Sequence, residues 1–444
     1  MSNYTCLFLT LLMCTSFASS NRRVRRQNRS DQLLADIGIR AESYDPRLLK
    51  NGIQPYTKID QDLRHLFLGT RRTTLNWALR NLERLNDRNT REGKMQSPIS
   101  KKTPFPCPLN NTRSSSPPTS IERLRPGDID IIAAFGDSLS AGNGIMSNNA
   151  FDMINEFRGL TFSGGGLADW RQFLTLPNIL KVFNPKLYGY AVDNALVINH
   201  RSSRLNIAEP LIMSQDLPFQ ARVLIDLLRR DPNVDMKNHW KLLTVFVGNN
   251  DICTDLCHWD NPQDLLNQHA KDLQRAFRLL RDNVPRLLIN VIVVPNIMLT
   301  LSTMKQVPLQ CFVVHRVGCH CLINDRLSRS ELEQRLKTVQ RWQQLDMEVS
   351  RLAEFQREDF AIISHPALAN VSASILPNGQ SDWRFFSHDC FHFSQRGHAL
   401  ISNLVWNGML LPDELKPRPK KMSARFPKLM CPTADQPYLI VRPS

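Results

Sequence analysis

Hydrophobic residues follow two different patterns in the part of the chain after residue 127. Short, nearly unbroken apolar runs are typical of buried strands, and they occur at 129–135, 242–247, 287–294 and 360–363. Longer segments with an apolar residue every three or four positions are typical of amphipathic helices, and they occur at 219–230, 262–283, 328–357 and 395–409. Because strands and helices alternate, the pattern predicts an α/β fold in which helices cover both faces of a mainly parallel sheet.

The first part of the chain has a different character. Residues 21–118 are basic and polar and are interrupted by proline and asparagine, although Leu75, Leu79 and Leu82 share one helical face. These changes in composition predict four parts: a signal peptide at 1–20, a basic N-terminal segment and linker at 21–120, the main domain at 121–412, and a C-terminal tail at 413–444 that a disulfide ties back.

The beginning of the sequence indicates export. An apolar run at 6–17 is too short to span a bilayer and is followed by small residues, which is typical of a signal peptide cleaved near Ser20. A basic run at 22–26 then offers a processing site. Since no later run of about 18 apolar residues occurs, we expect a secreted protein without a transmembrane anchor.

The net charge narrows the choice of partners. The chain has 444 residues and a formal net charge of +15 at pH 7, which would suit nucleic acid, an anionic membrane or an acidic glycan. Much of this charge lies before Gly127, outside the predicted main domain. This position favours a cationic pro-segment or tail, and we predict no nucleic-acid partner.

Cysteine usage agrees with an oxidising compartment. Two of the ten cysteines fall in the predicted signal peptide, which leaves an even number for disulfides. Cys253 and Cys257 are close enough to pair locally, and Cys107 and Cys431 could tie the ends of the main domain together. Two more bridges of open connectivity would use Cys311, Cys319, Cys321 and Cys390.

A metal site is the alternative for part of this cysteine-rich region. His315, Cys319, His320 and Cys321 are crowded together in the sequence. Their spacing lacks the paired pattern of structural zinc sites, and export favours disulfides. We therefore predict no metal and no cofactor.

Four polar residues follow predicted strands or lie near the closing helix, and together they suggest nucleophilic catalysis. Ser138 comes directly after the first strand, and Asn250 follows the strand at 242–247. Asp389 precedes His392 by three residues, so one turn can bring its carboxylate to the imidazole. In parallel sheets such sites form at the carboxyl ends of the strands. We predict Ser138 as nucleophile, His392 as base, Asp389 as its orienting partner, and the Ser138 N–H and Asn250 amide as oxyanion donors.

Each of these residues also has an ordinary structural interpretation. Gly-Asp-Ser is a common turn composition, and asparagine is frequent in turns. Asp389 and His392 could merely cap the helix that begins near Ser394.

Several motifs resemble the GDSL, or SGNH, hydrolase family and stand in the same order. These are Gly136-Asp137-Ser138-Leu139, Gly248-Asn249-Asn250-Asp251 and Asp389-Cys390-Phe391-His392. Stretches at 175–185, 216–221 and 382–394 are similar to the membrane-associated phospholipase B branch of that family. The resemblance implies a three-layer α/β/α fold and a metal-free serine esterase of acyl glycerols and phospholipids. It also implies that Ser138, Asp389 and His392 form the triad and that Asn250 stabilises the oxyanion.

The sequence departs from the family pattern at one position. The family motif Asn-x-Ala-x-x-Gly-Ala aligns with residues 206–212, so that Leu211 stands where the family has its oxyanion glycine. Leucine keeps the N–H donor but tolerates positive φ badly, and its side chain could crowd the pocket. The departure predicts either low activity or an altered choice of substrate.

These observations lead to one main functional prediction with two alternatives. We expect a secreted phospholipase B-like serine esterase that hydrolyses phospholipids or lysophospholipids during transient contact with a membrane or micelle surface. The alternatives are a lipid-binding protein with little or no turnover and a carbohydrate O-acetyl esterase. Oligomeric state stays open. Glycosylation sequons predict surface positions for Asn28, Asn110 and Asn370.

Overall fold

The computed structural model describes residues 58–302, 307–323, 327–423 and 425–441. All of them belong to one compact unit, Tyr56–Ser444. The predicted signal peptide, the basic run at 22–26 and Asn28 lie outside the described residues. The domain boundary near residue 120 stays a prediction.

Parallel strands form the centre of this unit. In the described residues the sheet has the order β1 (Ile129–Gly136), β2 (Trp240–Phe246), β3 (Leu287–Ile292) and β4 (Phe360–His365). Each predicted strand is present, with its ends shifted by one or two residues. Nearly every strand side chain is buried, which explains why the strands are continuous apolar runs in the sequence.

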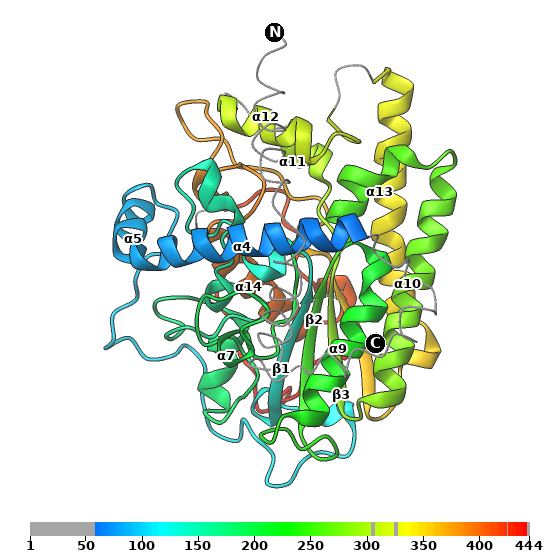
Figure 1. Ribbon diagram of the computed structural model, residues 1–444. Coiled ribbons are helices and arrows are strands. Elements are labelled where there is room, and N and C mark those ends of the chain that lie inside the picture. Colours follow the sequence, from blue (N-terminus) through cyan, green and yellow to red (C-terminus); the bar gives the residue numbers. More distant parts are fainter. Residues whose placement is uncertain (1–57, 303–306, 324–326, 424, 442–444) are drawn as a thin grey trace, which may run out of the picture. The chain divides into compact units, whose positions relative to one another are not determined.

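Helices cover both faces of the sheet. The helices that pack on it are α7 (Leu176–Phe183), α9 (Leu217–Arg230), α10 (Pro262–Asn283), α13 (Arg329–Ser350) and α14 (Gln395–Met409). Leu242 and Leu288 pack into one core with α7 and α14, whereas Leu243 and Ile289 pack into a second core with α9 and α10. Figure 1 shows these two pairs of helices on opposite sides of β1–β3. The predicted three-layer α/β/α architecture is confirmed.

The helix predicted at 328–357 is shorter than expected. Ser328 caps α13 and exchanges hydrogen bonds with Glu331, as the sequence pattern indicates. The helix ends at Ser350, however, because the chain must turn through Ala353–Phe355 to begin β4.

The remaining α-helices of the described residues precede the sheet or lie in the connections between its strands. They are α4 (Lys58–Arg80), α5 (Leu82–Arg91), α6 (Ser138–Ala141), α8 (His200–Ser203), α11 (Ile297–Ser302) and α12 (Leu309–Gly318). Ala78 of α4 and Leu85 of α5 share a small core with Ile145, Phe157 and Leu160. Helices α4 and α5 are therefore packed on the sheet-bearing part of the chain. No described helix is long and apolar enough to cross a bilayer.

A loop segment extends the sheet beyond β1. The β1 residue Ala134 accepts a hydrogen bond from Ile207 N–H at 2.9 Å and donates its own N–H to Leu205 at 3.1 Å. Farther along, Glu209 donates its N–H to the Gly136 carbonyl at 3.0 Å. This pairing brings the segment before Leu211 to the carboxyl end of β1.

Four disulfides lie in the described part of the chain, and they correct one predicted pairing. The bridge between Cys107 and Cys431 is present as predicted. Cys253 and Cys257 do not pair with each other, because residues four apart on a helical turn hold their Cβ atoms farther apart than a disulfide allows. The other three bridges are Cys253–Cys319, Cys257–Cys321 and Cys311–Cys390.

Candidate functional site

Ser138 is lifted out of the sheet by an abrupt break at the end of β1. Gly136 has φ 130°, and a Cβ there would lie 2.0 Å from the Phe246 carbonyl oxygen of β2, so only glycine fits. Asp137 caps α6 by accepting the Leu139 N–H at 2.9 Å. Ser138 is the first residue of that short helix and is half-buried.

Three side chains from distant parts of the sequence meet at this break. The Ser138 Oγ lies 2.8 Å from His392 Nε2, and His392 Nδ1 lies 2.6 Å from Asp389 Oδ2. The other oxygen of Asp389 accepts the N–H groups of Phe391 and His392, both at 3.0 Å, and the Ser387 hydroxyl at 2.8 Å. The arrangement fixes the direction of the imidazole and can move a proton from Ser138 to His392.

The electrostatics of the site favour a charged carboxylate beside the imidazole. Burial raises the pKa of Asp389, but the charge and hydrogen bond of His392 outweigh this and hold its pKa well below the ordinary value. Burial lowers the pKa of His392, but Asp389 and, more weakly, Asp137 raise it above the ordinary value. Burial raises the pKa of Asp137 itself to about 6.

The two asparagines after β2 bind different neighbours. Asn249 donates its side-chain amide to the Asp137 carboxylate at 3.2 Å and so connects the ends of β1 and β2. Asn250 donates its side-chain amide to the Ile212 carbonyl at 2.8 Å. Since an amide group carries two hydrogens, Asn250 can hold this loop and still donate a second hydrogen bond.

Leu211 has the backbone conformation that glycine would favour. Its φ is 66°, in the left-handed region, and its side chain is 69% exposed. The side chain is therefore directed largely toward solvent rather than packed among its neighbours. The positive φ that makes leucine unfavourable here is present, as the sequence predicts. The exposure of the side chain does not support the predicted crowding of a pocket.

A buried ionic cluster, which the sequence analysis missed, holds the loop that contains Leu211. Arg71 of α4 binds Glu156 in a buried ion pair and Glu209 at 2.7 Å. Arg158 binds the other oxygen of Glu156. Burial raises the pKa of Glu209, and Arg71 opposes that shift. No motif in the sequence links residue 71 with residue 209, because their contact depends on how α4 packs.

A second serine–histidine–aspartate arrangement was also missed. Ser214 Oγ lies 2.8 Å from His269 Nδ1, and His269 Nε2 lies 2.8 Å from Asp346 Oδ1. All three side chains are at least 97% buried, so substrate cannot reach Ser214. Asp251 accepts the Ser214 N–H at 3.0 Å, and burial raises the pKa of Asp251 to about 7. This network holds the chain between Leu211 and α9 in place.

A small apolar cavity lies next to the triad. Its volume is about 30 Å³. Leu139, which follows Ser138, and Phe391, which precedes His392, both line it. The remaining walls are Asn249, Pro295, Ile297, Val371, Phe386, Cys390, Phe393 and Met422. Its apolar lining suits a hydrocarbon group.

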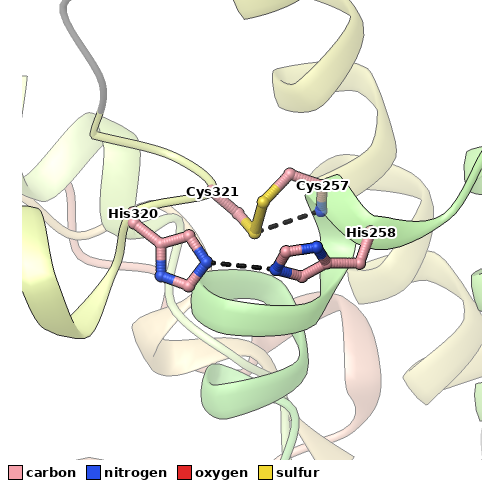
Figure 2. Close-up of side chains that lie close together, drawn as sticks. All are labelled: Cys257, His258, His320 and Cys321. Carbon is pink, nitrogen blue, oxygen red and sulfur yellow. Dashed lines mark hydrogen bonds between the residues drawn. A yellow bond between two sulfur atoms is a disulfide. The ribbon is translucent and has the colours of Figure 1, made fainter.

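The structure separates the residues that the sequence offered as an alternative metal site. His315 Nε2 contacts the Cys390 carbonyl, and Cys319 is in a disulfide, so the four residues named above do not form one cluster. Figure 2 shows instead that His258 and His320 lie beside the Cys257–Cys321 disulfide, with their Nε2 atoms 3.3 Å apart. Both sulfurs are in that disulfide, so only two imidazole ligands remain, fewer than a structural zinc site uses.

Two of the three predicted glycosylation sequons can be located in the structure. Asn110 and Asn370 are both exposed. Their positions are compatible with the prediction, which no contact in the structure tests further.

Comparison with known proteins identifies the family. The sequence model of the GDSL-like lipase/acylhydrolase family matches residues 132–405. The chain is 36% identical over 334 residues to membrane-associated phospholipase B1 of Homo sapiens and 35% identical to that of Mus musculus. Each alignment covers 73% of this chain and 22% of the relative, so the chain spans less than a quarter of these relatives' length. With more than half of its residues matched and its three motifs meeting at one site, the chain belongs to the GDSL-like lipase/acylhydrolase family.

Proposed function

We propose that the chain is a secreted serine esterase of the phospholipase B type, which hydrolyses acyl ester bonds of phospholipids and lysophospholipids. The observation that carries the proposal is the continuous contact from Ser138 through His392 to Asp389, at 2.8 and 2.6 Å. Hydroxyl, imidazole and carboxylate in this order are the parts that acyl transfer by serine requires.

The reaction would proceed through an acyl-serine intermediate. Ser138 Oγ attacks the ester carbonyl carbon while His392 Nε2 takes the hydroxyl proton. The tetrahedral intermediate then collapses, the bond to the alcohol oxygen breaks, and His392 returns the proton to that leaving alcohol. A water molecule, deprotonated by His392, next attacks the acyl group and releases the fatty acid and the free Ser138 hydroxyl.

Three groups would stabilise the negative oxygen of the tetrahedral intermediate. These are the main-chain N–H groups of Ser138 and Leu211 and the second amide hydrogen of Asn250. The hydrogen bond from Asn250 to the carbonyl of Ile212 supports this assignment, because it links the amide donor to the loop that carries Leu211.

The substrate class rests on two supporting observations. The cavity that Leu139 and Phe391 help to line has an apolar lining that suits part of an acyl chain. The relatives are named phospholipase B1.

The proposal can be tested on the purified secreted protein. It should hydrolyse phospholipid, lysophospholipid and a short aryl ester, and a fluorophosphonate probe should modify Ser138 but not the buried Ser214, as mapped by mass spectrometry. Absence of hydrolysis of all three esters together with an unmodified Ser138 would refute the proposal. Preferential hydrolysis of acetylated glycans would favour the O-acetyl esterase alternative.

The second candidate is a lipid-binding protein with weak turnover, and the left-handed conformation of Leu211 is the observation that favours it. We expect Leu211→Gly to raise the free energy of unfolding by up to about 1 kcal/mol, because strain is relieved and the greater freedom of unfolded glycine offsets part of the gain. Since the leucine side chain is mostly exposed and its N–H is retained, kcat/KM should change less than about 10-fold.

Denaturant unfolding and ester hydrolysis measure the two effects of Leu211→Gly. The matched control is Leu415→Gly, because Leu415 is also exposed but lacks positive φ. It should be neutral or destabilising. A gain in kcat/KM of about 100-fold or more for Leu211→Gly would instead indicate that the oxyanion site of the natural protein is impaired.

The raised pKa of His392 leads to a prediction about pH. His392 accepts the Ser138 proton only when it is neutral, so kcat/KM should rise with pH through an apparent pKa above the ordinary 6.5 and then level off. The raised pKa of His392 also stabilises the folded state at pH values below the ordinary pKa. This stabilisation is lost as the pH rises through the pKa that His392 has in the folded state. Measuring kcat/KM for a soluble ester against pH at constant ionic strength gives this apparent pKa. An apparent pKa below 6.5 would contradict the assignment of His392 as the base.

A further inference from the structure

Helix α12 exposes an unusual number of apolar side chains on one side. Leu309, Phe312, Val313 and Val317 are 76%, 46%, 52% and 73% exposed. Their spacing of three or four residues places them on one face of the helix. We call these four residues the outer face of α12. Such a concentration of exposed apolar residues on a short helix is typical of an interaction surface.

The opposite side of α12 is attached to the segment that carries the triad. Cys311 and His315 are buried, and Cys311 is in a disulfide with Cys390. His315 Nε2 also lies 3.3 Å from the Cys390 carbonyl. Because Cys390 lies between Asp389 and His392, these contacts fix the helix relative to the triad. Figure 1 shows α12 at the top of the view, beyond the end of the sheet.

The charge on this helix is positive. Arg316 follows His315, and its guanidinium lies over the Phe312 ring, 4.0 Å from the centroid. Helix α12 contains no acidic residue. A short helix with an apolar side, an arginine and no acidic residue has the properties of segments that lie in the headgroup region of a membrane.

We propose that the outer face of α12 docks on an anionic phospholipid surface and so holds the Ser138–His392–Asp389 site against the lipid. This inference rests on the proposed function, because it names the surface from which that site would take its substrate. A phospholipid surface fits better than a second copy of the chain, since a symmetric contact through this face would cover Arg316 of both copies, and α12 offers no acidic residue to pair with either.

Vesicle binding by an inactive protein tests the docking separately from catalysis. In a Ser138→Ala background, Leu309→Ser with Val317→Ser should reduce co-sedimentation with vesicles of phosphatidylcholine and phosphatidylserine in equal amounts by about 10-fold to 100-fold. The matched control is Leu415→Ser, which removes a leucine of similar exposure from a different element. It should bind like the parent protein.

A fluorescence measurement gives a second test that does not depend on losing binding. Phe312→Trp in the same background should show a blue shift and increased emission when these vesicles are added, relative to the parent protein. A vesicle-bound protein without such a shift at position 312 would place the contact elsewhere and overturn the proposal. Unchanged circular dichroism and thermal unfolding should accompany the serine variants, because the substituted side chains are mostly exposed.

Activity in the Ser138 protein separates the docking proposal from the proposed function. The double serine variant should lose hydrolysis of vesicle phospholipid but keep hydrolysis of a soluble short-chain ester. Equal loss on both substrates, or no loss on vesicles, would overturn the docking proposal, as would a dimer that the same substitutions dissociate in light scattering. If the natural protein hydrolyses neither substrate, the proposed function fails, while the vesicle-binding result still decides the role of α12.

Discussion

Replacement of Ser138 by alanine should reduce kcat for ester hydrolysis by at least about 10⁴-fold, because it removes the protein atom that attacks the acyl carbon in the proposed reaction. His392→Ala should cost a similar factor, since the hydroxyl then loses its base. The Ser138→Ala/His392→Ala double variant should be little worse than either single variant, because the two residues act as one unit. Initial rates on lysophospholipid and on a soluble ester, with protein of verified fold, measure these effects.

An exposed histidine provides a control for the His392 variant. His258 contacts His320 and takes no part in the proposed reaction, so His258→Ala should retain the natural rate. Hydrolysis that survives in both Ser138→Ala and His392→Ala would mean that another site in the protein carries the activity. The buried Ser214–His269–Asp346 arrangement would then need testing, although its burial argues against access.

Replacement of Arg71 by methionine should lower the free energy of unfolding by about 3–5 kcal/mol. The substitution leaves the carboxylate of the fully buried Glu156 without its ion pair to α4 and removes the 2.7 Å contact with Glu209. Activity should fall as well, because Glu209 belongs to the loop that carries Leu211. Guanidinium unfolding monitored by circular dichroism gives the stability, and kcat/KM on a soluble ester gives the activity.

The neighbouring arginine offers a matched control for this experiment. Arg72 is exposed, so Arg72→Met removes the same charge from the same helix and should change the free energy of unfolding by no more than about 0.5 kcal/mol. If Arg71→Met and Arg72→Met have the same free energy of unfolding, the ionic cluster does not hold α4 in place.

The Arg71 cluster joins residues inside the range that the family model matches to a residue outside it. The match to the family begins at residue 132, after α4 and α5 have ended. A fragment limited to 132–405 would keep Glu156 and Glu209 but lose Arg71, and so would leave the buried carboxylate of Glu156 with less compensation. For this chain, residues 58–91 belong with the part that carries the site.

The sequence by itself determined the features that depend on neighbouring residues. Buried parallel strands need apolar side chains on both faces, so β1 to β4 could be predicted to within two residues. The break after β1 and the three-residue spacing of Asp389 and His392 are also local. Because parallel strands end at a common edge, the segments of Ser138 and Asn250 were expected to meet there. The pairing of Ser138 with His392 and Asp389 was predicted from the chemistry of these residues and from the family resemblance.

Only the tertiary structure decided the features that depend on contacts between distant segments. Cys253 and Cys257 pair with Cys319 and Cys321 because a helical turn directs both toward another loop, which their spacing alone could not reveal. The contact of Arg71 with Glu209 depends on how α4 packs. The apolar residues of α12 would be read as core from their helical spacing, and their exposure follows from Cys311 and His315 occupying the buried side. A hydrophobic pattern states which residues share a face, but packing decides which face is covered.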